Sequence, residues 1–256
     1  MDDFSGRPGA ALVVGGSGGI GRAVVRLLAA RGSDVAFTWR TGEAAAEALA
    51  GDVRGYGVRV SAHRLEATDA EACVRVVEDV VGHHGALHTL VHAAGPHVPM
   101  THLGNVEPGA MTEQLNQDAG AFFNAARPAL PPLRESGGSI VAVTTAATSR
   151  FPVRDGLSSA PKAAVEALVR ALAVEEGRYG VRANCVGPGM LTDGMADRLI
   201  SSGELDDRAL AVARANIPLR RFGIAHDIAE AVCFLASHRA GFISGQKLDV
   251  DGGYGA

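Results

Sequence analysis

The segment GGSGGIG, Gly15–Gly21, decides the fold, because it joins an apolar run, AALVV (Ala10–Val14), to a helical pattern, Ile20–Arg31. A short, wholly apolar run is typical of a strand buried on both faces of a parallel sheet. Apolar residues then recur at helical spacing up to Gly32, a residue type that commonly ends helices. The order of strand, glycine-rich turn and helix predicts the first unit of a nucleotide-binding sheet.

Glycines in such a turn permit positive φ angles and let the backbone approach a bound diphosphate. The free N–H groups and the positive end of the helix dipole then face that anion. The alternative interpretation is a flexible turn without a ligand. We predict diphosphate binding by the loop residues Gly15, Ser17, Gly18, Gly19, Ile20 and Gly21.

Strands and helices alternate along the rest of the chain. Further strands are predicted at Asp34–Thr38, Val58–His63, His88–Gly95, Ser139–Thr144, Val181–Gly187 and Gln246–Val250. Helices are predicted at Glu43–Asp52, Asp69–Val81, Pro108–Gln117, Ala119–Ala129, Ser159–Arg178, twice within Thr192–Ala215, and at Asp227–Ser237. No repeat or linker divides residues 1–256. We therefore expect one α/β domain, a doubly wound parallel sheet of about seven strands with helices on both faces.

Composition narrows the function classes. The chain has 256 residues, 47% hydrophobic and 20% charged, as expected for a globular domain with a sizeable core. A net charge of -4 offers no footprint for nucleic acid, and no basic run favours an anionic membrane. Without a bilayer-spanning run or a secretion signal, we expect a cytoplasmic protein. The three cysteines fit reduced packing thiols better than a disulfide framework or metal site.

Motifs spread over the chain resemble those of the short-chain dehydrogenase/reductase family. The family's T-G-x-x-x-G-x-G falls on Val14, Gly15, Gly19 and Gly21, with valine replacing threonine. HAAG (His92–Gly95) resembles its N-N-A-G, and GPG (Gly187–Gly189) resembles the turn that embraces the nicotinamide. The C-terminal signature is matched by IPLRRFG (Ile217–Gly223), DIAEAVCFLAS (Asp227–Ser237) and GQKLDVDGG (Gly245–Gly253).

The resemblance implies a Rossmann domain and an oxidoreductase that uses a nicotinamide dinucleotide, most similar to 3-oxoacyl reductases. It further implies cofactor contacts beyond the glycine loop, from Ala93, Ala94, Gly95, Lys162, Pro188, Gly189, Leu191 and Thr192.

Arg40 decides between the two dinucleotides. An acidic residue at the end of the second strand would bind the ribose and select NAD, but Arg40 follows Trp39 there. A guanidinium suits a 2′-phosphate, and Thr41 adds a hydroxyl. NADP(H) is therefore preferred and NAD(H) is the alternative, although Gly18 stands where NADP users often have a basic residue. Glu66 takes the place of the family's adenine-facing aspartate.

The catalytic residues depart from the family pattern of tyrosine, lysine, serine and asparagine. SSAPK (Ser158–Lys162) aligns with Y-x-x-x-K, so Lys162 is retained and Ser158 replaces the tyrosine. The serine position is Thr145 and the asparagine position, by counting, is Gln117 with Asn116 beside it. A serine hydroxyl is a much weaker acid than a phenol and ends roughly 4 Å short of it. Ser158 is therefore not expected to take over the tyrosine's role.

Two other groups are candidate proton donors. Asp155 stands seven residues before Lys162, where related enoyl reductases place a tyrosine, and its alternative role is that of a turn residue. His97 lies on a loop near the expected nicotinamide, and its alternative is a solvated loop histidine. The tyrosines Tyr56, Tyr179 and Tyr254 are expected away from the fifth strand's end. The six histidines from His83 to His102 lack suitably placed partner ligands, so no metal site is predicted.

Three functions remain open. The first is an NADPH-dependent reductase of an apolar carbonyl or acyl substrate, with a lid near residues 190–222 that includes Met195, Leu199 and Ile200. The second is a non-redox isomerase, cyclase or lyase that keeps the dinucleotide pocket as a scaffold. The third is a silent NADP(H)-binding subunit paired with an active relative. The resemblance implies a homodimer or homotetramer through Ala119–Ala129 and Ser159–Arg178, or such a hetero-oligomer.

Overall fold

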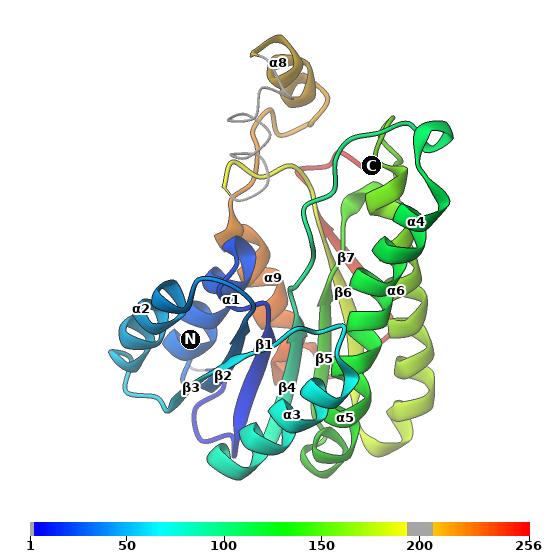
Figure 1. Cartoon of the computed structure of the whole chain (residues 1–256). Coiled ribbons are helices and arrows are strands. Elements are labelled where there is room, and N and C mark those ends of the chain that lie inside the picture. Colours follow the sequence, from blue (N-terminus) through cyan, green and yellow to red (C-terminus); the bar gives the residue numbers. More distant parts are fainter. Residues whose placement is uncertain (1–2, 194–206) are drawn as a thin grey trace.

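A parallel seven-stranded sheet in the order β3-β2-β1-β4-β5-β6-β7 forms the centre of the computed structural model (Figure 1). Residues 3–193 and 207–256 are described. The strands are β1 (Ala10–Val14), β2 (Asp34–Trp39), β3 (Val60–Arg64), β4 (Leu87–His92), β5 (Ser139–Val143), β6 (Arg182–Pro188) and β7 (Lys247–Val250). The chain order reverses between β1 and β4, which is where open α/β sheets form their ligand crevice.

Helices cover both faces of the sheet (Figure 1). One face carries α1 (Gly19–Ala30), α2 (Glu43–Arg54) and α9 (Ala225–Ala236). The other carries α3 (Ala70–His84), α5 (Ala121–Ser136) and α6 (Gly156–Glu176). Near the carboxyl edge of the strands lie α4 (Pro108–Leu115) and, beyond that edge, α8 (Asp207–Ala215) (Figure 1).

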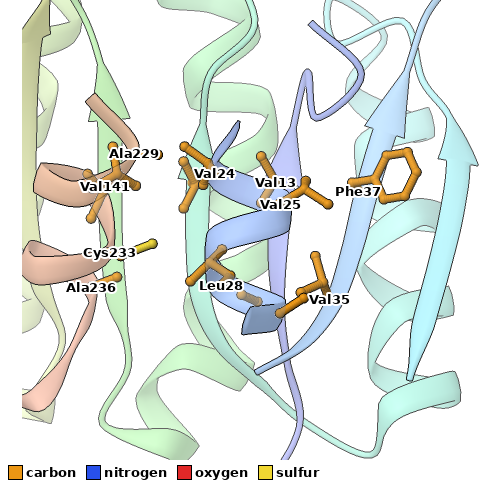
Figure 2. Close-up of a cluster of buried hydrophobic side chains, with 14 of the residues drawn as sticks. Val13, Val24, Val25, Leu28, Val35, Phe37, Val141, Ala229, Cys233 and Ala236 are labelled. Carbon is orange, nitrogen blue, oxygen red and sulfur yellow. The ribbon is translucent and has the colours of Figure 1, made fainter. Parts of the chain in front are cut away.

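Buried aliphatic side chains hold these layers together. In Figure 2, Val24 and Leu28 of α1 pack between Val13 of β1 and Cys233 of α9. Each large aliphatic side chain buried in this way contributes about 1.5–3 kcal/mol of favourable transfer free energy. All three cysteines are free and buried, and burial raises the pKa of the Cys233 thiol to about 12. They serve as packing thiols, as predicted.

The single parallel sheet and its alternation with helices confirm the predicted fold. The third strand begins at Val60 rather than Val58, because the Arg59 N–H donates to the Asp34 carboxylate at 2.8 Å. Of the two helices predicted within Thr192–Ala215, α8 is described, whereas Met195, Leu199 and Ile200 lie outside the described residues. No helix in the described ranges is long and apolar enough to span a bilayer.

Candidate active site

The glycine loop between β1 and α1 is packed so closely at several of its glycines that no side chain would fit there. Gly15 has a φ of 79°, and its N–H donates to Thr38 Oγ1 at 2.9 Å. A Cβ on Gly15 would lie 2.7 Å from the Ala94 backbone, and one on Gly21 would lie 2.2 Å from the Gly15 carbonyl oxygen. Gly18 precedes α1 without a side-chain cap. The first turn of α1 therefore presents uncovered N–H groups, which fit a diphosphate.

Arg40 and Glu66 flank the crevice on the β2–β3 side of this loop. Arg40 Nη1 lies 3.8 Å from Glu66 Oε2, and both side chains are more than half exposed, at 60% and 51%. Thr41, next in the chain, is exposed as well. An exposed pair of this kind contributes only about 0–1 kcal/mol, so the guanidinium can turn to an incoming phosphate at little cost.

Lys162 and Asp118 form an ion pair on the β4–β5 side of the loop. The Lys162 ammonium lies 3.4 Å from both carboxylate oxygens of Asp118. Gln114 Nε2 donates to Asp118 Oδ2 at 2.6 Å. Only 15% of the Lys162 side chain and 4% of the Asp118 side chain are exposed. Because an unpaired charge at such a buried place would cost free energy, burial favours keeping the two side chains paired.

The structure corrects the position assigned to the family's asparagine. Gln117 is partly buried and its amide donates to Glu113 Oε1 at 2.6 Å, so that group is engaged away from Lys162. Asn116–Gly120 form a π-helical turn between α4 and α5, which accommodates one more residue per turn than an α-helix. Counting through this turn misses by one residue, and Asp118 is the side chain that reaches Lys162. The available sequence signal was the spacing of Gln114 and Asp118 on one helix face.

Asp155 stands at the N-terminus of α6, yet its carboxylate does not cap the helix. Its backbone carbonyl accepts the N–H groups of Ser158 and Ser159, and no side-chain cap bond is made. Burial raises the pKa of the Asp155 carboxyl above its ordinary value, and the nearby Lys162 ammonium partly offsets that rise. This carboxyl is thus free of a capping role and lies within the field of Lys162.

Thr145 and Ser158 are the two hydroxyl residues that the sequence motifs associate with Lys162. Thr145 lies two residues beyond the end of β5, and its Oγ1 accepts the Ala147 N–H at 3.2 Å, which leaves the hydroxyl proton free to donate. Ser158 is partly buried and lies one helical turn before Lys162, so both residues share a face of α6.

His97 is not among the residues that contact Lys162 or Asp118, and the described residues form no metal-binding group. His97 is exposed on the loop after β4, and within the described residues it makes no ion pair or hydrogen bond. No three His, Cys, Asp or Glu side chains in residues 3–193 and 207–256 come together as a metal-binding group.

Tyr254 lies closer to the end of β5 than its place in the sequence predicts. Arg150, just after the turn that follows β5, stacks on the Tyr254 ring at 4.7 Å and donates to its carbonyl oxygen. The C-terminal segment turns back toward this edge because the Asp251 carboxylate accepts the Gly253 and Gly255 N–H groups. Tyr179, by contrast, stacks on Arg134 and Arg178 at the opposite end of α6.

His92, at the end of β4, is buried without a hydrogen-bond partner for either ring nitrogen among the described residues. Its ring packs edge-on against Phe122, with 5.5 Å between the ring centroids. Burial, reinforced by the positive charge of Lys162, lowers the pKa of His92 to about 4. Burial also lowers the pKa of His88, on the same strand, to about 3. Both rings are therefore neutral in the folded protein at neutral pH.

These histidines should make the fold sensitive to acid. Below pH 6.5, their ordinary pKa, they bind protons in the unfolded chain but not in the folded one, so stability falls as the pH drops and levels off below about 3. Between pH 7.5 and pH 5, His92 should account for a loss of about 2 kcal/mol in the free energy of unfolding. In urea denaturation, the free energy of unfolding of His92→Asn should therefore fall by about 2 kcal/mol less than that of wild type over this pH range. His102→Asn, an exposed control, should lose as much as wild type. Equal acid loss in His92→Asn and wild type would contradict this.

A separate hollow lies at the opposite, amino-terminal edge of the sheet. It has a volume of about 770 Å³ and is lined by residues that include Arg7, Arg182 and Phe242. It does not touch the glycine loop or Lys162, so it is distinct from the site above.

Comparisons with known proteins show similarity along nearly the whole chain. A family model described as enoyl-(acyl carrier protein) reductase matches residues 14–255. The 3-oxoacyl-[acyl-carrier-protein] reductase FabG of Staphylococcus aureus is 32% identical over 247 residues, which cover 95% of this chain and 96% of that protein. Versicolorin reductase stcU of Emericella nidulans is 30% identical, covering 95% and 94% of the two chains.

Two solved structures extend the similarity to three dimensions. A short-chain dehydrogenase/reductase from Serratia marcescens superposes with a TM-score of 0.89 at 29% identity, covering 99% of this chain and 100% of that one. A blue fluorescent protein from a metagenomic library, solved in complex with NADPH, superposes with a TM-score of 0.88 at 31% identity and the same coverage.

Proposed function

The chain belongs to the short-chain dehydrogenase/reductase family, and we propose that it reduces an apolar carbonyl or 3-oxoacyl substrate with NADPH, using Asp155 as proton donor. One observation carries the proposal: the half-buried Asp155 carboxyl lies within the field of Lys162, at the sheet edge where the glycine loop opens. The family supplies the reaction class, and the residues of this chain supply the departures from it.

The cofactor is proposed to lie across the carboxyl edge of the sheet. The loop residues Gly15, Ser17, Gly18, Gly19, Ile20 and Gly21 would hold the diphosphate, while Glu66 faces the adenine and Arg40 with Thr41 meets the 2′-phosphate. The nicotinamide end of the cofactor would contact Ala93, Ala94, Gly95, Lys162, Pro188, Gly189, Leu191 and Thr192. When bound, the dihydronicotinamide supplies a hydride to the substrate carbon. A similar protein crystallised with NADPH supports this choice of cofactor.

The substrate oxygen needs a proton as the hydride arrives. Ser158 is too short and too weak an acid to provide it. Asp155 is protonated over a wider pH range than an ordinary aspartate, because burial raises the pKa of its carboxyl. Thr145 would donate a hydrogen bond to the substrate carbonyl, and Asp118 would hold Lys162 in place through their ion pair. The two groups that donate to the substrate oxygen, Asp155 and Thr145, are then held by the start of α6 and by the turn after β5.

Arg40 should control the choice between the two dinucleotides. Its charge-assisted hydrogen bonds to a 2′-phosphate are worth about 1.5–3 kcal/mol, so Arg40→Ala should weaken NADPH binding by roughly 10- to 100-fold. NADH binding should stay within two-fold, because NADH lacks that phosphate. Fluorescence titration of both coenzymes measures this, with Arg26→Ala, an exposed α1 arginine paired with Asp52, as control. Equal losses for NADPH and NADH would refute the assigned role.

Consumption of NADPH with a panel of ketones and 3-oxoacyl thioesters tests the reaction itself. Turnover by the wild type supports the reductase. If the wild type binds NADPH without turnover and Ser158→Tyr acquires turnover, the protein is instead a silent subunit. If both bind NADPH and neither turns over any carbonyl, a non-redox enzyme on this scaffold is favoured.

We also propose that the chain assembles as a homodimer or homotetramer through α5 and α6. Large apolar side chains on these helices are exposed: Phe123 at 46% and Val174 at 82%. Sedimentation of the purified protein tests this, and a monomer at micromolar concentration would exclude it. If the protein is a silent subunit, we expect it to form an oligomer only with an active relative.

A further inference from the structure

A second ion cluster lies behind Thr145, and no step proposed above uses it. Its members are Thr148, Ser149, Glu166, Lys247 and Asp249, and we name it the Lys247 cluster. The Lys247 ammonium lies 3.0 Å from Asp249 Oδ1, 3.5 Å from Glu166 Oε1 and 3.0 Å from Ser149 Oγ, to which it donates. Thr148 Oγ1 donates to Glu166 Oε1 at 2.7 Å. Ser149 Oγ donates to Asp249 Oδ2 at 2.7 Å.

Lysine is rare in this chain, and Lys247 is one of its few occurrences. The chain has 24 lysines and arginines, of which only Lys162 and Lys247 are lysines. Both have side chains that are about 15% exposed and paired with carboxylates. All the other residues in this count are arginines, whose planar guanidinium group delocalises the positive charge. Lysine thus occurs only at two sites where its compact ammonium meets carboxylates that are buried or partly buried.

The cluster joins the two segments that border the nicotinamide end of the crevice. Thr148 and Ser149 belong to the turn that begins at Thr145, after β5, while Asp249 lies on β7 beside Gly187 of β6. A Cβ on Gly187 would lie 2.0 Å from Asp249 Oδ1, 2.7 Å from Lys247 Cε and 3.1 Å from the Thr145 carbonyl carbon. Glu166 ties the same cluster to α6, one turn beyond Lys162.

Strand order says which part of the cofactor this region faces. The glycine loop proposed for the diphosphate follows β1, and Arg40 and Glu66, which follow β2 and β3, would hold the adenosine there. The remaining nicotinamide half must then lie over β4, β5 and β6. We propose that the Lys247 cluster is a positioning device, which fixes the distance between Thr145 and the Gly187–Gly189 turn so that the nicotinamide half is bound. The inference rests on the proposed NADP(H) binding.

A ligand pair separates this role from general stabilisation. NADPH contains both halves of the cofactor, whereas 2′-phospho-ADP-ribose lacks the nicotinamide. Lys247→Met leaves Glu166 and Asp249 without their shared cation, so the turn after Thr145 and the Gly187–Gly189 turn should separate. Calorimetry should show that NADPH affinity falls about 10-fold or more, while 2′-phospho-ADP-ribose affinity stays within two-fold.

Controls make each outcome decisive. Gln246→Met, at an exposed neighbouring position, should leave both affinities unchanged. Glu166→Gln keeps an acceptor for Thr148 and should show a smaller loss confined to NADPH; it decides the matter if Lys247→Met does not fold. Equal losses for both ligands, or no loss for either, would overturn the positioning role. A wild type that binds neither ligand would instead refute the proposed function.

Discussion

Replacing Gly21 with alanine should reduce NADPH affinity by about 100-fold or more, because the first turn of α1 can then no longer stay open against a diphosphate. The added Cβ would lie 2.2 Å from the Gly15 carbonyl oxygen and 2.9 Å from the Gly16 Cα. Neither atom belongs to a flexible side chain, so the backbone of the loop must move. Titration of NADPH fluorescence measures the loss.

Gly82→Ala is the matched control for this change. Gly82 lies within α3, and a Cβ there would meet nothing within 4 Å. Alanine is the better helix former by about 1 kcal/mol, so this variant should be at least as stable as wild type and bind NADPH normally. Circular dichroism shows whether Gly21→Ala remains folded. A folded Gly21→Ala protein with wild-type NADPH affinity would show that the loop is not the diphosphate site.

The second large effect is expected at Asp155. Asp155→Asn keeps the size of the side chain but removes the acidic proton, so carbonyl reduction should slow by about 10²- to 10⁴-fold. NADPH affinity should change little. In the wild type, turnover should decline as the pH rises through the pKa of Asp155, which burial holds above that of an ordinary aspartate, because only the protonated carboxyl donates. Steady-state kinetics across pH tests both statements.

Three further variants guard against a wrong donor. Asp52→Asn removes an exposed carboxylate paired with Arg26 and should leave turnover unchanged. Tyr254→Phe removes a phenol that lies beside Arg150, and His97→Ala removes the other candidate proton donor; both variants should also be active. If either of them is inactive while Asp155→Asn turns over normally, the proton comes from that group and not from Asp155.

Hydrophobic periodicity and turn residues predicted the sheet and most helices because these are local signals. The wholly apolar β1 and the glycine loop after it fixed the first unit, and Asp69, expected to start a helix, caps α3 by accepting the Ala72 N–H at 3.0 Å. The start of β3 was missed by two residues because a distant carboxylate, Asp34, engages the Arg59 N–H. Such a contact is tertiary and leaves no pattern in the neighbouring sequence.

The candidate site was predicted less completely for the same reason. Arg40, Glu66 and Lys162 were named from motif spacing; Arg40 and Glu66 lie just beyond the ends of β2 and β3, and Lys162 lies in α6. Asp118 was missed because a π-helical turn shifts the count by one residue, and Tyr254 because the C-terminal segment folds back toward β5. The Lys247 cluster joins residues about 100 positions apart, so no local signal announces it.

The proposed activity requires an open helix N-terminus that binds the diphosphate, with Arg40 placed for the 2′-phosphate. Calorimetric titration of the wild-type protein with NADPH and with NADH tests this directly. We expect saturable binding of both, with NADPH at least about 10-fold tighter through its extra phosphate. An absence of binding heat with both coenzymes, at several temperatures, would contradict the account.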